Sequence, residues 1–242
     1  MGDRSFLPKP PETELRENEI HVWRAWLDCE PAVLYQLNPT LASDERLRAD
    51  RFVFERDRNR FVAARGILRQ LLAEYVKRSP SELQFNYGPQ GKPLLLANDV
   101  TSPLEFNISH SHGLALFAFA KKRSLGIDVE LLRPEFAGES IARRYFSATE
   151  IEEFLALPPD LRTEGFFLCW TRKEAYIKAR GEGLQIPLTS FSVSLTPGQP
   201  EILQSVDGFR WSVRSFRPAQ QYVAAVIGEG KGWTLRQWEW TA

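Results

Sequence analysis

Leu125-Gly126-Ile127-Asp128-Val129-Glu130 alternates aliphatic residues with small or acidic ones. This alternation predicts a β-strand with its three aliphatic side chains on one face and Gly126, Asp128 and Glu130 on the other. The two carboxylates then lie about 7 Å apart along the strand. Like charges on one face need a partner, and a hard divalent cation with oxygen ligands is a suitable one. A solvent-exposed strand edge is the alternative interpretation.

A second acidic element lies downstream, in Trp170-Thr171-Arg172-Lys173-Glu174-Ala175-Tyr176-Ile177-Lys178. It falls in an amphipathic helix predicted over residues 164–179, where Glu174 and Lys178 are four positions apart and share a face. An ordinary surface ion pair would explain these two residues. The functional interpretation is a third carboxylate for the same cation, with a lysine beside it that meets a phosphate.

The composition describes a chain that can bury a sizeable core and carries no excess charge. Of its 242 residues 43 % are hydrophobic, and 31 Lys and Arg balance 31 Asp and Glu. This balance argues against a protein that binds nucleic acid through bulk charge. Cys29 and Cys169 are far apart, so a disulfide framework is not expected and a reducing compartment fits. Since we see no secretory signal and no apolar run long enough to span a bilayer, we expect a cytoplasmic protein.

Periodicity and turn residues predict the α+β class with two similar halves. We expect an arm at residues 1–18, an N-terminal half at 19–122 and a C-terminal half carrying the metal site at 123–242. A long helix at 57–76 has apolar residues at helical spacing, and the helix at 164–179 is its counterpart. This faint repeat predicts a pseudo-twofold arrangement with a ligand cleft between the halves.

Shorter elements are expected around these two helices. Further helices are predicted at 43–54, at 141–145 and after the capping box formed by Ser147 and Glu150. Strands are predicted at 19–27, 104–112, 113–120, 190–195, 209–216, 221–227 and 233–240. The Gly- and Pro-rich residues 87–93 predict a loop.

Ser109 and His110 do not form a nucleophile–base pair, because adjacent residues of a strand point to opposite faces. His110 is instead a phosphate contact or an ordinary turn histidine. Further basic side chains could contact an anion, although a solvent-exposed charge is the alternative for each. These are Arg46, Arg48, Arg51 and Lys92. The sequence contains no Walker loop and no dinucleotide-binding glycine motif.

The motifs together resemble the 4′-phosphopantetheinyl transferases, and in particular the two-halved, surfactin-activating (Sfp) type. The similarity runs in order from about Arg48 to Val193. The motifs that carry it are Gly91-Lys92-Pro93, Phe106-Asn107-Ile108-Ser109-His110-Ser111, Gly126-Ile127-Asp128-Val129-Glu130, Phe146-Ser147 with Glu150, Trp170 to Lys178, and Gly183-Leu184. One departure lies in the first-half basic cluster, where the family often has lysines and this chain has arginines. Arginine also binds phosphate.

The resemblance implies a reaction, a fold and a partner. Such an enzyme transfers the 4′-phosphopantetheine moiety of coenzyme A to a serine hydroxyl of an acyl or peptidyl carrier protein and releases adenosine 3′,5′-bisphosphate. It depends on Mg²⁺ and has a pseudo-twofold α+β fold with coenzyme A in the cleft between the halves. A chain with both halves is expected to act as a monomer. The pathway that the carrier protein serves stays open.

The resemblance also implies roles for individual residues. Mg²⁺ would be bound by Asp128, Glu130 and Glu174. Lys178 would hold the phosphate and assist the leaving group, and coenzyme A would further contact Arg48, Lys92, Asn107, Ser109 and His110. The group that deprotonates the serine is Glu174, directly or through a metal-bound water, or else Glu150. The alternatives are a non-catalytic coenzyme A or nucleotide-binding module on the same fold and an unrelated Mg²⁺-dependent phosphotransferase or phosphatase.

Overall fold

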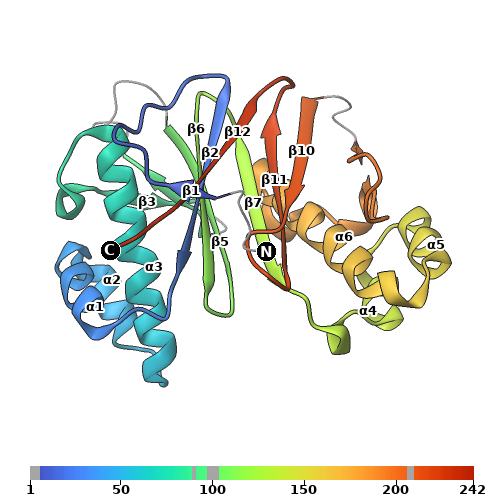
Figure 1. Ribbon diagram of the computed structural model, residues 1–242, viewed down its shortest axis with the longest axis horizontal. Helices are drawn as coiled ribbons and strands as arrows, with labels where there is room; N and C mark the ends of the chain where they lie inside the picture. The colour runs from blue at the N-terminus through green and yellow to red at the C-terminus, as the bar shows by residue number, and fades with distance from the viewer. Residues whose placement is uncertain (1–5, 89–90, 97–103, 206–209) are drawn as a thin grey trace.

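Two β-sheets face each other in the middle of the molecule, and helices cover the outer face of each (Figure 1). The computed structural model describes residues 6–88, 91–96, 104–205 and 210–242. Two residues of the predicted loop, Pro89 and Gln90, and the first residue of the strand predicted at 209–216 lie outside these ranges.

The elements of the first half are β1 (Leu7–Pro8), β2 (Glu19–Trp26), α1 (Pro31–Leu37), α2 (Ser43–Ala49), α3 (Glu55–Val76), β3 (Phe85–Tyr87), β4 (Pro93–Leu95), β5 (Leu104–Ser111) and β6 (Leu114–Lys121). Those of the second half are β7 (Leu125–Leu131), α4 (Glu139–Tyr145), α5 (Ala148–Ala156), α6 (Pro159–Arg180), β8 (Ser192–Val193), β9 (Leu203–Gln204), β10 (Trp211–Phe216), β11 (Tyr222–Glu229) and β12 (Thr234–Glu239). The two long helices and the long strands thus fall where the sequence predicts them.

Two helix boundaries differ from the prediction by five residues, each for a local reason. Helix α6 begins at Pro159 rather than at residue 164, because a proline in the first turn of a helix lacks only an N–H that would be unsatisfied there anyway. Helix α2 ends at Ala49 rather than at residue 54. The chain turns after it, and Phe52 packs against Phe61 of α3 with ring centroids 5.3 Å apart.

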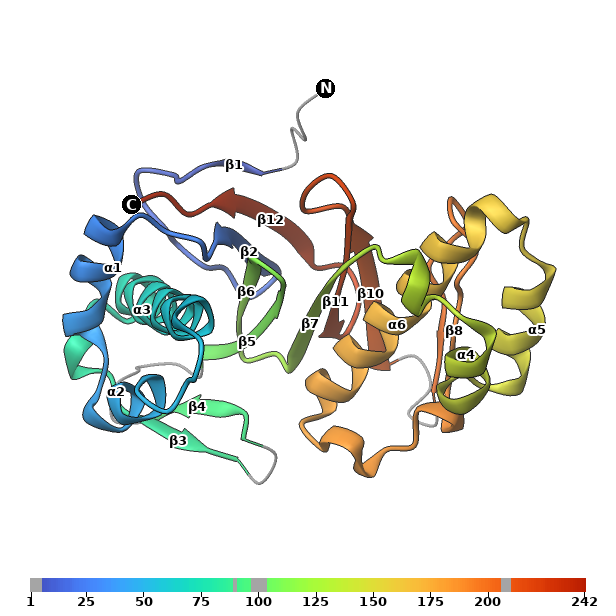
Figure 2. The same cartoon turned by 90° about the horizontal axis from the view of Figure 1, so that it is seen from below.

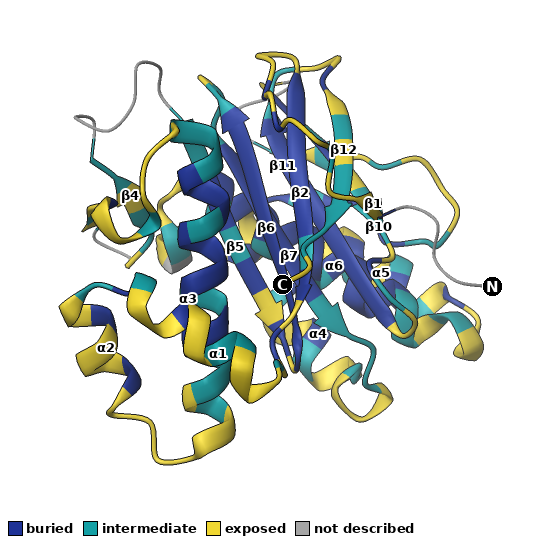
Figure 3. Ribbon diagram, turned by 60° about the vertical axis from the view of Figure 1, so that its left-hand side comes forward, coloured by how far each residue is buried: buried dark blue, intermediate teal, exposed yellow. Residues whose placement is uncertain are grey.

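The layers are α3, a five-stranded sheet, a three-stranded sheet and α6. The strand orders are β1-β12-β2-β6-β5 and β10-β11-β7. Aliphatic residues of β7 fill the core between the two sheets, as predicted: Leu125, Ile127 and Val129 are fully buried against β2 and β6. Separate cores join α3 to the first sheet and α6 to the second. Figure 3 shows the buried strands in the centre and the exposed residues of α1 and α2 at the periphery.

The two ends of the chain meet in the first sheet. Strand β12 pairs in parallel with β2, and β1 pairs with the other edge of β12 (Figure 2). The last strand of the chain therefore lies beside the first half, and the boundary expected at residues 122 and 123 stays a prediction. The described part of the arm is mostly exposed, and the buried side chains of Phe6, Thr13 and Leu15 anchor it. Within the described residues, no helix has the length and hydropathy that a membrane crossing needs.

Helix α6 lies directly on Gly126 of β7. A Cβ at this position would come within 2.1 Å of the carbonyl oxygen of Ala175 and 2.4 Å of the backbone nitrogen of Ala179. Backbone atoms of a helix cannot yield as a flexible side chain can. The absence of a side chain at Gly126 therefore sets how closely α6, with Glu174 and Lys178, approaches β7.

We predict that Gly126→Ala lowers the free energy of unfolding by about 2–3 kcal/mol, because the added methyl group overpacks a backbone contact. Gly138→Ala is the matched control, since its Cβ would find Ser140 Oγ only at 3.8 Å. Urea denaturation of both variants measures the difference. Equal stability of the two variants would show that α6 can move away from β7 without cost.

Candidate active site at the junction of β5 and β7

Polar side chains of β5 replace a backbone hydrogen-bond ladder between the two sheets. β5 and β7 are edge strands of different sheets. Three N–H groups of β7 donate to β5 side chains at a constant offset of 20 residues: Ile127 to Asn107 at 2.9 Å, Val129 to Ser109 at 3.4 Å and Leu131 to Ser111 at 3.2 Å. The N–H groups at the unpaired edge of β7 therefore have acceptors, as buried backbone groups require.

The same two serines hold the two acidic residues of β7. Ser109 Oγ donates to Asp128 Oδ1 at 2.8 Å, and Ser111 Oγ donates to Glu130 Oε2 at 2.7 Å. Asp128 is only 4 % exposed. The alternation predicted for β7 thus places both carboxylates at the junction rather than on a solvent-exposed strand edge.

Lys178 reaches this junction from α6. Its Nζ donates to Asp128 Oδ1 at 2.6 Å, to Ser109 Oγ at 3.1 Å and to the carbonyl oxygen of Ile127 at 3.3 Å. The lysine therefore forms an ion pair with Asp128 of another element, which argues against the alternative of an isolated surface pair with Glu174. The second oxygen of Asp128, Oδ2, is buried and finds no hydrogen-bond partner among the described residues.

Glu174 lies near the same charges. Burial raises its pKa to about 7, with a further rise from the negative charges of Asp128 and Glu130 and an opposing effect of Lys178. The pKa of Glu130 is also raised, mainly by burial. The three carboxylates thus repel one another. In the described part of the chain, no three Asp, Glu, His or Cys side chains converge on one point in a metal-ready arrangement.

The donor set nevertheless fits a hard divalent cation. All three side chains offer carboxylate oxygens, which such ions prefer. Asp128 Oδ2 is a buried acceptor without a donor among the described residues. A cation would offset both the burial that raises the pKa values of Glu130 and Glu174 and the smaller repulsion between the carboxylates. Lys178 supplies part of the compensating charge in the structure.

The other candidate base, Glu150, has a structural role. Its side chain is 1 % exposed and accepts hydrogen bonds from the N–H groups of Ser147 and Val193, both at 2.7 Å. Lys173 Nζ lies 2.8 Å from the same carboxylate. The predicted capping box is confirmed, and both oxygens are engaged. We therefore withdraw Glu150 as a candidate base.

The predicted cofactor contacts line two adjoining cavities. The smaller cavity, of about 260 Å³, is lined by Lys92, Asn107 and Lys178 among others. The larger, of about 520 Å³, is lined by Arg48 and His110 among others. Both cavities share Pro93 and Ile108, so they meet beside β5. Ser109, between Asn107 and His110, lies at the junction itself.

Three residues of the larger cavity were missed in the sequence. Arg60 and Arg65 of α3 and His112 after β5 line it together with His110. Both arginines lie on the polar side of α3, and the helix was predicted from its apolar face alone. Arg60 is held by two hydrogen bonds to Asp28, at 2.6 and 2.7 Å. In the sequence, Arg60 lies four residues after Arg56, so the two share one helix face, and this spacing could have indicated a basic surface on α3.

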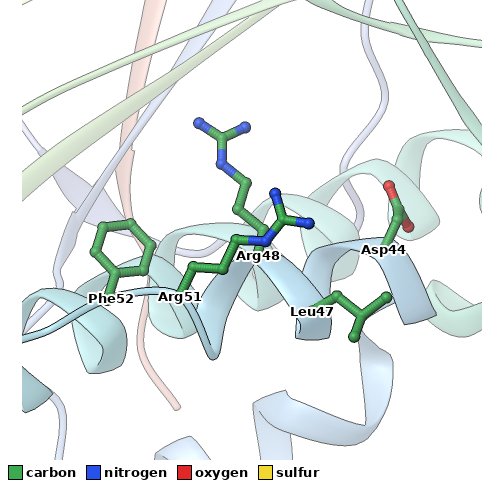
Figure 4. A pocket seen from close by; sticks show the side chains of 5 residues that line it. All are labelled: Asp44, Leu47, Arg48, Arg51 and Phe52. Carbon is green, nitrogen blue, oxygen red and sulfur yellow. The ribbon is translucent and has the colours of Figure 1, made fainter.

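A third hollow, of about 630 Å³, lies over α2. Its lining is Asp44, Leu47, Arg48, Arg51 and Phe52 (Figure 4). The side chains of Arg48 and Arg51 extend to the same side of the helix. Arg48 and Phe52 also line the larger cavity, so the predicted arginine cluster adjoins the site. Arg46 does not line this hollow.

Known proteins resemble this chain over almost its whole length. A family model described as "4′-phosphopantetheinyl transferase superfamily" matches residues 124–227, and one described as "4′-phosphopantetheinyl transferase, N-terminal" matches residues 24–122. The 4′-phosphopantetheinyl transferase HetI of Nostoc sp. is 42 % identical over 240 residues, which cover 99 % of this chain and 100 % of the relative. The chain belongs to the 4′-phosphopantetheinyl transferase family. The predicted family and α+β fold class are confirmed.

Other members of the family match over shorter segments. The transferase Sfp of Bacillus subtilis is 34 % identical over 155 residues, covering 64 % of this chain and 66 % of the relative. The holo-[acyl-carrier-protein] synthase of Thermotoga maritima has 26 % identity and a TM-score of 0.35, over 45 % of this chain and 63 % of that protein. The Bacillus anthracis enzyme, crystallised in complex with CoA (3′,5′-ADP), has 23 % identity and a TM-score of 0.35, over 44 % and 94 %.

We predict that Glu174 makes the metal-free protein less stable as the pH rises. Its pKa is about 7 in the folded protein and has an ordinary value of 4.5, so the folded state retains a proton that the unfolded chain has lost between these values. The contribution of Glu174 to the free energy of unfolding therefore falls from pH 4.5 to 7. The pKa of His21, which burial lowers to about 4, acts in the opposite direction over part of this range, so the effect of Glu174 is measured as a difference from the parent. Relative to the parent, Glu174→Gln should gain stability as the pH rises in urea titrations without divalent cations. Glu164→Gln, nearer the start of the same helix, is the control. An unchanged pH dependence in Glu174→Gln would refute the proposed environment.

Proposed function

We propose that the β5–β7 junction is the active site at which this transferase moves the phosphopantetheine arm of coenzyme A onto a carrier-protein serine. The transferase activity follows from the family. The observation that carries the assignment of the site is the contact of Lys178 with both Asp128 and Ser109. It joins motif residues of β5, β7 and α6 at one point, and cavities large enough for parts of a nucleotide lie beside it.

Asp128, Glu130 and Glu174 would hold Mg²⁺ here. The buried, unpartnered Asp128 Oδ2 and the mutual repulsion of the carboxylates support this assignment. When bound, the ion neutralises charge on the pyrophosphate of coenzyme A.

Two residues of α6 would act in the transfer: Glu174 on the proton of the serine hydroxyl and Lys178 on the leaving group. Glu174 would accept the proton of the serine hydroxyl, directly or through a water molecule. Its pKa is about 7 without the cation, and the positive charge of a bound cation would lower that pKa. The serine oxygen forms a bond to the β-phosphorus while the bond from that phosphorus to the bridging oxygen breaks. Negative charge then grows on the released adenosine 3′,5′-bisphosphate. The Lys178 ammonium stabilises this charge more strongly in the transition state than in the ground state.

The remaining contacts place the nucleotide. Arg48 and His110 would bind the 3′-phosphate in the larger cavity. Ser109, the other predicted phosphate contact, faces the junction instead, and its hydroxyl proton is donated to Asp128. Lys92 lines the smaller cavity, where burial lowers its pKa. Asn107 uses its carbonyl oxygen to hold Ile127, so its amide N–H groups are the donors left for the cofactor.

Both sides of the site come from one chain, so we expect the transferase to act as a monomer. Cys29 and Cys169 are both free thiols, which suits a reducing cytoplasm. The carrier protein is either an acyl or a peptidyl carrier protein. Neither the oligomeric state nor the compartment enters the assignment of the active site.

Transfer itself tests the proposal. A purified apo carrier protein should gain the mass of one phosphopantetheine when it is incubated with coenzyme A, Mg²⁺ and this protein.

Lys178→Met should lower kcat about 10²-fold or more, because one electrostatic stabiliser of the transition state is lost, while coenzyme A affinity changes much less. Lys9→Met, which removes an exposed ion pair with Glu74, is the control. If the parent protein binds coenzyme A yet modifies no carrier protein, the non-catalytic binding module is the better account.

We predict that His110→Ala distinguishes coenzyme A from 3′-dephospho-coenzyme A. The proposed contact is with the 3′-phosphate, and a hydrogen bond to a charged group contributes about 1.5–3 kcal/mol. Calorimetry should therefore show at least about tenfold weaker binding of coenzyme A and little change for the dephospho form. Equal losses for both ligands would remove His110 from this role.

A further inference from the structure

Ser111, the last residue of β5, is hydrogen-bonded both to the backbone of β7 and to the carboxylate of Glu130. Its hydroxyl accepts the N–H of Leu131 at 3.2 Å and lies 2.7 Å from Glu130 Oε2. A hydroxyl has one proton, and an ionised carboxylate can only accept, so that proton is donated to Glu130. The side chain is only 7 % exposed, which restricts its rotation.

The arrangement repeats the one at Ser109. Each serine donates to the acidic residue found 19 positions further along the chain and accepts the N–H of the next residue. Asp128 and Glu130 differ in their burial and in their other hydrogen bonds. Asp128 is nearly fully buried and also bonded to Lys178, whereas Glu130 is a longer and partly exposed side chain. Glu130 therefore depends more on its serine.

We propose that Ser111 is a positioning residue that fixes the carboxylate of Glu130 for the cation at the junction. A glutamate has three rotatable bonds, and a free Glu130 would have to be ordered when the ion binds. Ser111 orders it beforehand, since the serine is itself fixed by the backbone of β7. Hydrogen bonds that orient metal ligands commonly change metal affinity about 10- to 100-fold. This inference rests on the metal assignment proposed above.

Asn107 provides a matched control on the same strand. Its side chain accepts the N–H of Ile127 at 2.9 Å, just as Ser111 accepts that of Leu131. No hydrogen bond joins Asn107 to a carboxylate in the described part of the chain. Removing either side chain therefore deletes one bond to β7, but only Ser111→Ala releases a carboxylate.

The experiment measures Mn²⁺ binding by electron paramagnetic resonance, without coenzyme A, in the parent protein and in three variants. We expect Ser111→Ala to raise the Kd about tenfold or more, and Ser111→Thr, which keeps the hydroxyl, to restore it. Asn107→Ala should leave the Kd unchanged. In transfer assays, Ser111→Ala should need more Mg²⁺ for half-maximal rate while kcat at saturating Mg²⁺ stays close to that of the parent. Circular dichroism checks that each variant folds.

Each other outcome has a distinct meaning. Equal Kd values for the parent and Ser111→Ala would overturn the role of Ser111 and leave the metal site intact. Equal weakening by Ser111→Ala and Asn107→Ala would show that the bond to β7 matters and the bond to Glu130 does not, which also overturns the inference. A parent protein that binds no Mn²⁺ would overturn the metal assignment and the inference with it.

Discussion

Three side chains of β5 take the place of the backbone groups that would otherwise pair with the edge of β7. Asn107, Ser109 and Ser111 accept the N–H groups of β7. A backbone ladder would merge the two sheets into one and leave no room for functional groups between them. Side chains satisfy the same donors and also present hydroxyl protons to Asp128 and Glu130. The contact that joins β5 to β7 is therefore also the contact that builds the proposed active site.

The remaining charges reach the junction because α6 is held in one orientation. Gly126 lets the helix backbone approach β7. On another side of the helix, Lys173 donates to the carbonyl oxygens of Leu188 and Phe191, both at 2.7 Å, and pairs with Glu150. Loss of one partner from such a buried pair is strongly destabilising. The pair of Lys173 and Glu150 therefore holds α6 in its orientation. The next residue, Glu174, and Lys178 one turn later are then held toward the acidic residues of β7.

Much of this could be predicted from local patterns, and the failures are non-local. Strict alternation in β7 gave the correct faces, and helical spacing gave α3 and most of α6. Adjacent positions on β5 correctly separated Ser109 from His110. Periodicity could not show that β12 pairs with β2, or that Lys178 bonds Asp128 rather than serving Glu174 alone. It also could not place Arg60 and His112 in one cavity, because that depends on how α3 packs beside β5.

A crystal structure of the complex with coenzyme A and Mn²⁺ tests the central claim most directly, because anomalous scattering locates the ion independently of activity. The account predicts one peak at the junction, at coordination distances of about 2.1 Å from carboxylate oxygens of Asp128, Glu130 and Glu174. Lys178 Nζ should then have left Asp128 Oδ1 for a phosphate oxygen. A bound coenzyme A with no ion at the junction, and with Lys178 still paired with Asp128, would contradict the account.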